Sequence, residues 1–104
     1  MERKGCFGVV WPSGERMAKP APLAKRFDTL DGKIIGELWD SLFRGDEMFS
    51  VLEEALTKRY PGVQFVNYKV FGSTHGGEET KVISAMPSLL REQGCDAVVS
   101  AVGC

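Results

Sequence analysis

Hydrophobic and polar positions become regular only in the last two thirds of this chain of 104 residues. Residues 33–39 are largely apolar and predict a strand, in which Gly36 indicates the close approach of another group. Residues 63–68 are rich in β-branched and aromatic side chains and predict a second strand. Residues 97–102 form an apolar run, which predicts a third strand buried on both faces, as in a parallel sheet.

Two segments between these strands have the three- and four-residue spacing of amphipathic helices. The first has Asp46 or Gly45 as its N-cap and runs to about Tyr60, before Pro61 and Gly62. The second runs from about residue 78 to residue 93 and contains Pro87, which is expected to kink it. The residues expected to face the core are Met48, Val51, Leu52, Ala55, Leu56 and Tyr60 in the first helix and Val82, Ile83, Met86, Leu89 and Leu90 in the second.

This order of elements predicts an α/β fold of the Rossmann-like, three-layer type. Strand, helix, strand, helix, strand is the βαβαβ half of a doubly wound sheet. Right-handed crossovers place the first strand between the other two, so the parallel sheet has the order 2-1-3. Residues 31–104 are expected to form this unit. Because no helix follows the third strand, we expect a half-domain truncated at its C-terminus, or a small domain completed by a partner.

Residues 1–30 lack this regularity and predict an irregular N-terminal arm. Pro12, Pro20 and Pro22 interrupt any long element, although residues 7–11 are apolar enough for a short strand. We expect the arm to lie on the domain surface or on a neighbouring subunit, in a homo-oligomer that covers the third strand. One interpretation of the whole chain is therefore a non-catalytic domain that dimerises through its arm and exposed sheet edge.

Composition narrows the range of partners. The chain has 13 basic and 14 acidic side chains and a net charge of -1, which argues against nucleic acid, because such binding depends on neutralising phosphates. The basic residues of the arm are spread among Gly and Pro and indicate a solvated segment. The apolar runs are too short to span a bilayer, and residues 1–11 lack the apolar stretch of a secretory signal. We therefore expect a cytoplasmic protein with no membrane partner.

Cysteine and histidine usage limits the metal and cofactor chemistry. Cys6, Cys95 and Cys104 form no CxxC pair, and the single histidine cannot build a His-rich site. The glycine spacing of a dinucleotide-binding turn is also absent. We predict no metal site and no cofactor, and free thiols in a reducing compartment.

Candidate chemistry gathers where the predicted strands end, because ligands of open α/β sheets bind at that carboxyl edge. Cys104 and His75 are the catalytic candidates. A thiol at a strand tip can act as a nucleophile or redox centre when its pKa is lowered, whereas a terminal carboxylate on the same residue would keep it inert. His75 is either catalytic or a solvated loop residue. The candidate substrate-binding residues are Trp39, Asp40, Arg44, Ser73, Thr74 and Gly103.

Several of these binding candidates also have a plainer interpretation. Arg44 could clamp an anionic substrate or form an ion pair with Asp40 or Asp46. Trp39 could belong to the core or to a pocket wall. The glycines of residues 72–77 could cradle a phosphate or carboxylate through backbone amides, or form an ordinary flexible loop. The ligand that fits these candidates best is a small anionic molecule.

Three segments resemble the UGSC family, which is named for a Sec/Cys-Gly-Ser-Cys motif just after the third strand. They are Leu30-Asp-Gly-Lys-Ile-Ile-Gly36, Phe71-Gly-Ser-Thr-His-Gly76 and Gly94-Cys-Asp-Ala-Val-Val-Ser-Ala-Val-Gly103. The resemblance covers about residues 24–104. It implies the front portion of a thiol- or selenol-dependent enzyme, with a reactive cysteine or selenocysteine at or just after Cys104.

The motif that names the family is not in this chain. Cys104 either fills its first position or immediately precedes it. Family members often carry selenocysteine there, encoded by a codon normally read as stop, so we expect the chain to end at such a codon or to be cut short there. The resemblance implies no established reaction, but its fold and cysteine placement are similar to those of cysteine-dependent amino-acid racemases and of thiol or selenol redox proteins.

Overall fold

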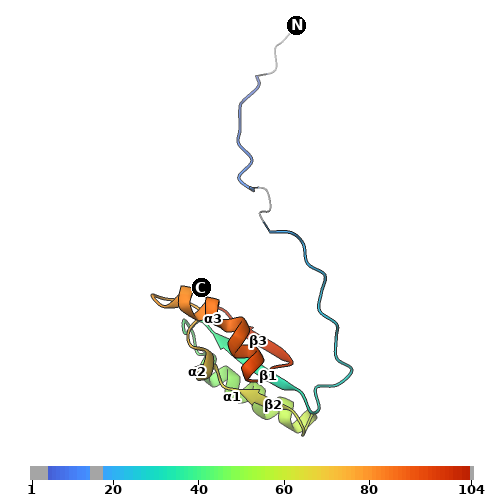
Figure 1. Cartoon of the computed structure of the whole chain (residues 1–104). Helices are drawn as coiled ribbons and strands as arrows, with labels where there is room; N and C mark the ends of the chain where they lie inside the picture. Colours follow the sequence, from blue (N-terminus) through green and yellow to red (C-terminus); the bar gives the residue numbers. More distant parts are fainter. Residues whose placement is uncertain (1–4, 15–17, 104) are drawn as a thin grey trace.

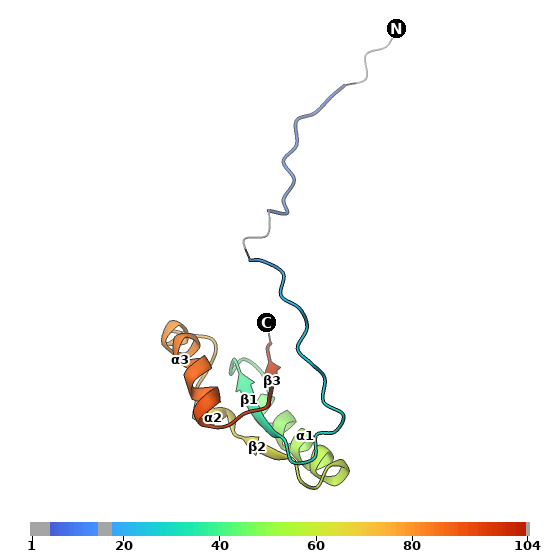
Figure 2. The same cartoon turned by 45° about the vertical axis from the view of Figure 1, so that its right-hand side comes forward.

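The computed structural model describes residues 5–14 and 18–103. In chain order, the elements are β1 (Ile34–Trp39), α1 (Gly45–Arg59), β2 (Gln64–Val66), α2 (Tyr68–Phe71), α3 (Glu79–Glu92) and β3 (Ala97–Ala101). The three strands form one parallel sheet in the order β2-β1-β3, and α1 and α3 lie on opposite sides of it (Figures 1 and 2). The predicted α/β fold and strand order are therefore confirmed.

The middle strand, β1, packs closely against α3. A Cβ atom at Gly36 would lie 3.1 Å from the Cys95 Sγ atom and 3.3 Å from both Leu90 and Phe71. The close approach predicted at this glycine is therefore confirmed, because a side chain there would force these neighbours to shift. Cys95 has a packing role here, and burial, followed by the charge of Asp96, raises the pKa of its thiol.

The second strand is shorter than predicted because a helical turn interrupts it. β2 pairs with β1 only as far as Gly36 and Val66, and the four residues of α2 follow. The Asn67 side chain caps this turn by accepting a hydrogen bond from the Lys69 amide. The chain then returns to the sheet, where Ser73 forms a parallel bridge with Trp39. The turn thus shifts the loop of residues 72–77 along the edge of β1.

The apolar faces of the two long helices differ in part from the predicted ones. Phe49 is the buried apolar residue of α1, whereas Met48 and Val51 are 59% and 68% exposed. In α3, the predicted core residue Ile83 is 56% exposed. These three residues have the spacing predicted for a core-facing stripe. In each helix, however, no other described element covers the side on which they lie.

β3 is also less buried than predicted, because its side chains alternate between half-buried and exposed. The expectation of a strand buried on both faces is therefore wrong for the described residues. Val98 is the register partner of Gly36 and is 45% exposed, although Leu90 of α3 lies close to Gly36 itself. On the opposite side, Val99 and Ala101 face an open groove beside α1.

The arm, residues 5–14 and 18–30, contains no helix or strand in its described part. The short strand expected over residues 7–11 is therefore wrong, because this segment has no strand partner there. Figure 1 shows the arm running away from the sheet. Near its junction with the domain, Lys33 Nζ lies 4.8 Å from the centre of the Phe27 ring. Among the described residues, no helix has the length and apolar character needed to cross a membrane.

Candidate functional site

The ends of β1 and β3 and the loop of residues 72–77 meet at the carboxyl edge of the sheet. The Asp40 amide donates a hydrogen bond to the Ala101 carbonyl (3.3 Å), and the Thr74 amide donates to the Trp39 carbonyl (3.1 Å). The residue that follows β1 is therefore bound to β3 on one side, and the end of β1 is bound to the loop on the other. This places the loop next to the middle strand rather than at the outer edge of the sheet.

Asp40 is the residue that fixes this edge, and only 4% of it is exposed. Its Oδ1 atom accepts a hydrogen bond from the Leu42 amide (3.1 Å), and its Oδ2 atom accepts one from the Gly103 amide (2.7 Å). Between these contacts, Ser41 has a φ of 65°, a strained conformation for a residue with a side chain. The Asp40 carboxylate thus holds the segment after β3 against the loop after β1.

Gly103 fits this position because it lacks a side chain. A Cβ atom there would lie 2.6 Å from Cδ1 of the Phe43 ring, which is too close for any ordinary contact. Phe43 is in turn held by an edge-to-face contact with Trp39, at 6.3 Å between ring centres. The backbone immediately before Cys104 is therefore located by a hydrogen bond on one side and an aromatic ring on the other.

Ser73 connects Asp40 to the loop that carries His75. Its Oγ atom lies 3.1 Å from the Asp40 carbonyl and 2.8 Å from the His75 carbonyl, and it accepts a hydrogen bond from the His75 amide. Because a hydroxyl has one proton, it donates to one of the two carbonyls at a time. The Ser73 side chain therefore organises the backbone of the loop.

The two ionisable candidates of the rim are exposed. The His75 side chain is 59% exposed, and its Nδ1 atom lies 3.9 Å from the Glu79 carboxylate at the start of α3. The Arg44 side chain is 85% exposed and lies 3.8 Å from the Glu47 carboxylate. The ion pair of Arg44 is therefore formed with Glu47 rather than with Asp40 or Asp46, and such an exposed pair adds little stability.

Trp39 belongs to an aromatic cluster beneath the rim. Its ring lies edge-to-face with Tyr68, at 4.9 Å between ring centres, and Tyr68 stacks on Phe49 of α1 at 5.6 Å. The Trp39 Nε1 atom is buried and has no hydrogen-bond partner among the described residues. Trp39 is thus mainly a packing residue, but one that carries an unsatisfied donor next to the site.

Glu37 is a buried acidic residue that was not among the predicted site residues. It lies in the middle of β1 with 0% of its surface exposed, and neither carboxylate oxygen makes a hydrogen bond of ordinary geometry within the described chain. Burial, and then the neighbouring Glu53 carboxyl, raise its pKa to about 7, against a smaller lowering effect of the Tyr68 backbone. A carboxylate within an otherwise apolar strand was the sequence signal for it.

The structure thus brings five of the eight predicted site residues together at one edge: Trp39, Asp40, Ser73, Thr74 and Gly103. His75 and Arg44 lie on its exposed rim. Cys104 lies outside the described residues, so its role stays a prediction. Within residues 5–14 and 18–103, no group of three His, Cys, Asp or Glu side chains is arranged to hold a metal ion.

Comparison with known proteins gives one result. No curated protein and no solved structure matches the chain. The model of the UGSC family matches residues 8–104, which include the whole sheet and both sides of the edge described above. The chain therefore belongs to the UGSC family.

Proposed function

We propose that this UGSC domain contributes a thiol- or selenol-dependent centre, located at or just after Cys104. The observation that carries the proposal is the hydrogen bond from the Gly103 amide to the buried Asp40 carboxylate, at 2.7 Å. It fixes the backbone one residue before Cys104 at the edge where open α/β sheets place their reacting groups. The reactive group would act as a nucleophile or as a redox centre.

Activation of the thiol in this proposal depends on His75. The buried carboxylate that holds Gly103, Asp40, is negative and disfavours a thiolate nearby, because like charges raise the pKa of an acid. Arg44 is directed toward Glu47. Among the described rim residues, His75 is the side chain that can accept the proton of the thiol and then stand beside the thiolate as a cation, which the always-protonated Arg44 cannot do. In this assignment Cys104 is the nucleophile and His75 is its base or imidazolium partner.

The substrate in this proposal is a small anionic molecule. The polar side chains available for it are the hydroxyls of Ser73 and Thr74 and the guanidinium of Arg44, whose exposed pair with Glu47 is weak enough to be exchanged. The start of α3 is a poorer anion site, because Glu78 and Glu79 already place negative charge there.

The proposal is tested by the pH dependence of alkylation at Cys104. The full chain is treated with iodoacetamide between about pH 5 and pH 10, and the modified peptides are quantified by mass spectrometry. An activated thiol reacts with an apparent pKa well below 8, compared with about 8.5 for an ordinary cysteine. Cys6, which is exposed in the arm, serves as the internal reference for an ordinary thiol.

An apparent pKa for Cys104 equal to that of Cys6 would contradict the proposal. Denatured chain in urea provides the matching control, because there the pKa of each thiol reflects its local sequence alone. A lowered pKa that disappears on denaturation shows that the fold, and not the local sequence, activates the residue.

A second candidate function is a small non-catalytic domain that dimerises through its arm and exposed sheet edge. The observation in its favour is the arm itself, in which Phe7, Val10 and Trp11 are 79–93% exposed. Burying apolar side chains of this size is favourable. Another copy of the chain could supply the surface against which they are buried. Sedimentation of the full chain at several concentrations tests this function, and a monomer at every concentration would contradict it.

A further inference from the structure

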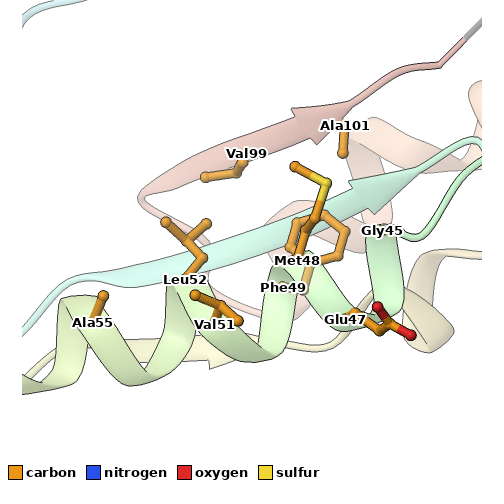
Figure 3. A pocket seen from close by; sticks show the side chains of 9 residues that line it. All are labelled: Gly45, Glu47, Met48, Phe49, Val51, Leu52, Ala55, Val99 and Ala101. Carbon is orange, nitrogen blue, oxygen red and sulfur yellow. The ribbon is translucent and has the colours of Figure 1, made fainter.

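An apolar groove of about 530 Å³ runs between α1 and β3. Figure 3 shows Met48 and Leu52 of α1 and Val99 and Ala101 of β3 on the two sides of the same space, and Val51 and Ala55 continue its α1 wall. An open space of this size, lined almost entirely by apolar side chains, is typical of a surface that binds another element.

β3 adds a second feature to this surface. It is an edge strand, because β1 is its only neighbour in the described sheet. Its outward backbone amides and carbonyls form a template on which another extended segment can pair. The groove and the free strand edge lie together, so one occupant could use both.

The arm carries a segment with the properties that this surface requires. Residues 7–11, Phe-Gly-Val-Val-Trp, are apolar and extended, and Phe7 and Val10 are 89% and 93% exposed. The segment has five residues, the same length as β3. No other described part of the chain covers it.

Charge also favours docking of the arm on the domain. Residues 1–26 contain six basic and two acidic side chains, whereas residues 27–104 contain seven basic and twelve acidic ones. The acidic residue Glu47 lines the groove itself. Opposite net charges on two surfaces speed their association and select the partner.

We propose that residues 7–11 of one copy dock on the α1/β3 groove and the β3 edge of a second copy, in a reciprocal exchange of arms. This inference specifies the surface used by the second candidate function above and rests on it, but not on the reactivity of Cys104. A second copy is favoured over the same chain because the arm leaves the sheet in an extended form (Figure 1). Pro20 and Pro22 stiffen it and disfavour a sharp reversal.

The test uses the full chain, three single substitutions and the double variant of the first two. Val10→Asp places a charge in the arm segment, and Val51→Asp places one on the exposed α1 wall of the groove. Ile83→Asp is the matched control, because Ile83 is similarly exposed on α3 but lies on the other side of the sheet. Far-ultraviolet circular dichroism checks that each variant folds, and sedimentation equilibrium measures the dimer dissociation constant.

We expect a wild-type dimer whose dissociation constant rises by about tenfold or more in each of the first two variants, since burying an unpaired charge is costly. The double variant should be little worse than either single one, because both remove the same contact. Ile83→Asp should leave the constant unchanged. Hydrogen exchange of the amides of residues 7–11 should slow at concentrations that favour the dimer.

Three results would overturn the proposal in distinguishable ways. A monomer at every concentration with an unprotected arm rejects both this surface and dimerisation. A monomer whose arm amides are protected shows docking within one chain. A dimer that both variants leave intact rejects this surface alone and leaves dimerisation standing.

Discussion

Glu37 is the residue whose environment departs most from what its side chain prefers. Its carboxyl group is fully buried in β1, and its closest ionisable neighbour, Glu53, is also acidic. Removing a carboxylate from water without a cation or a good donor favours the protonated form. Protonated Glu37 can donate to the Glu53 carboxyl, so the folded chain retains a proton that the unfolded chain loses.

This proton makes the stability of the protein depend on pH. Below pH 4.5, Glu37 is protonated in both the folded and the unfolded chain, so it adds no pH dependence. Between pH 4.5 and about 7, the folded pKa, only the unfolded chain ionises, and the free energy of unfolding falls as the pH rises. The total loss expected from this group is up to about 3 kcal/mol, and it is complete above pH 7.

The substitution Glu37→Gln should remove this dependence, because glutamine has a similar shape and does not titrate. Urea unfolding at pH 5, 6, 7 and 8 measures it, with Glu92→Gln, on the exposed surface of α3, as the control. Wild type and the control should lose stability between pH 5 and 7, and Glu37→Gln should lose less. Equal slopes in all three proteins would show that Glu37 is not the titrating group.

At the scale of the elements, one carboxylate connects three of them. Asp40 follows β1, accepts a hydrogen bond from Leu42 in the loop before α1, and accepts another from Gly103 after β3. Asp40→Ala leaves two partly buried amides without acceptors, which should lower the free energy of unfolding by about 2 kcal/mol. Asp40→Asn keeps one acceptor oxygen and should cost about half as much.

Urea unfolding measures these losses, and Asp28→Ala, in the exposed part of the arm, is the matched control. Hydrogen exchange at the Gly103 amide supplies a local readout, since it should become faster in Asp40→Ala than global unfolding alone requires. An Asp40→Ala protein as stable as the control would contradict this role of Asp40.

The elements also show which parts of the structure the sequence could predict. Strand and helix types followed from periodicity, and the order β2-β1-β3 followed from the handedness of crossovers. The turn of α2 was missed because residues 68–71 continue the aromatic and β-branched composition of β2. This turn is stabilised by the Asn67 cap and by the tertiary contacts of Tyr68. Neither feature produces a regular spacing of apolar residues in the sequence.

Burial was the least predictable property of the helices. The spacing of Met48, Val51 and Ile83 is that of a core stripe, yet these side chains are exposed. A period of 3.6 residues shows which side chains share a face, but not whether another element covers that face. The same limit explains why Glu37 was missed, because its neighbours in space come from other elements.

At the scale of the whole molecule, the sequence predicted which residues share the carboxyl edge of the sheet, but not the hydrogen bonds that join them. The rule that parallel strands direct their ends to one edge located Trp39, Asp40, Ser73 and Gly103 correctly. The hydrogen bonds of Asp40 and Ser73, by contrast, depend on side-chain geometry. They connect the backbone of the loop that carries His75 to the residue that follows β1.

The central claim of the proposed function is that His75 and Cys104, three residues after β3, act on each other. The most direct test is the apparent pKa of Cys104 in wild type and in His75→Gln, measured by the rate of alkylation with iodoacetamide. The neutral glutamine cannot stabilise a thiolate, so we predict that the pKa of Cys104 rises by about one unit or more, while that of Cys6 stays constant. An identical pKa for Cys104 in the two proteins would contradict the claim.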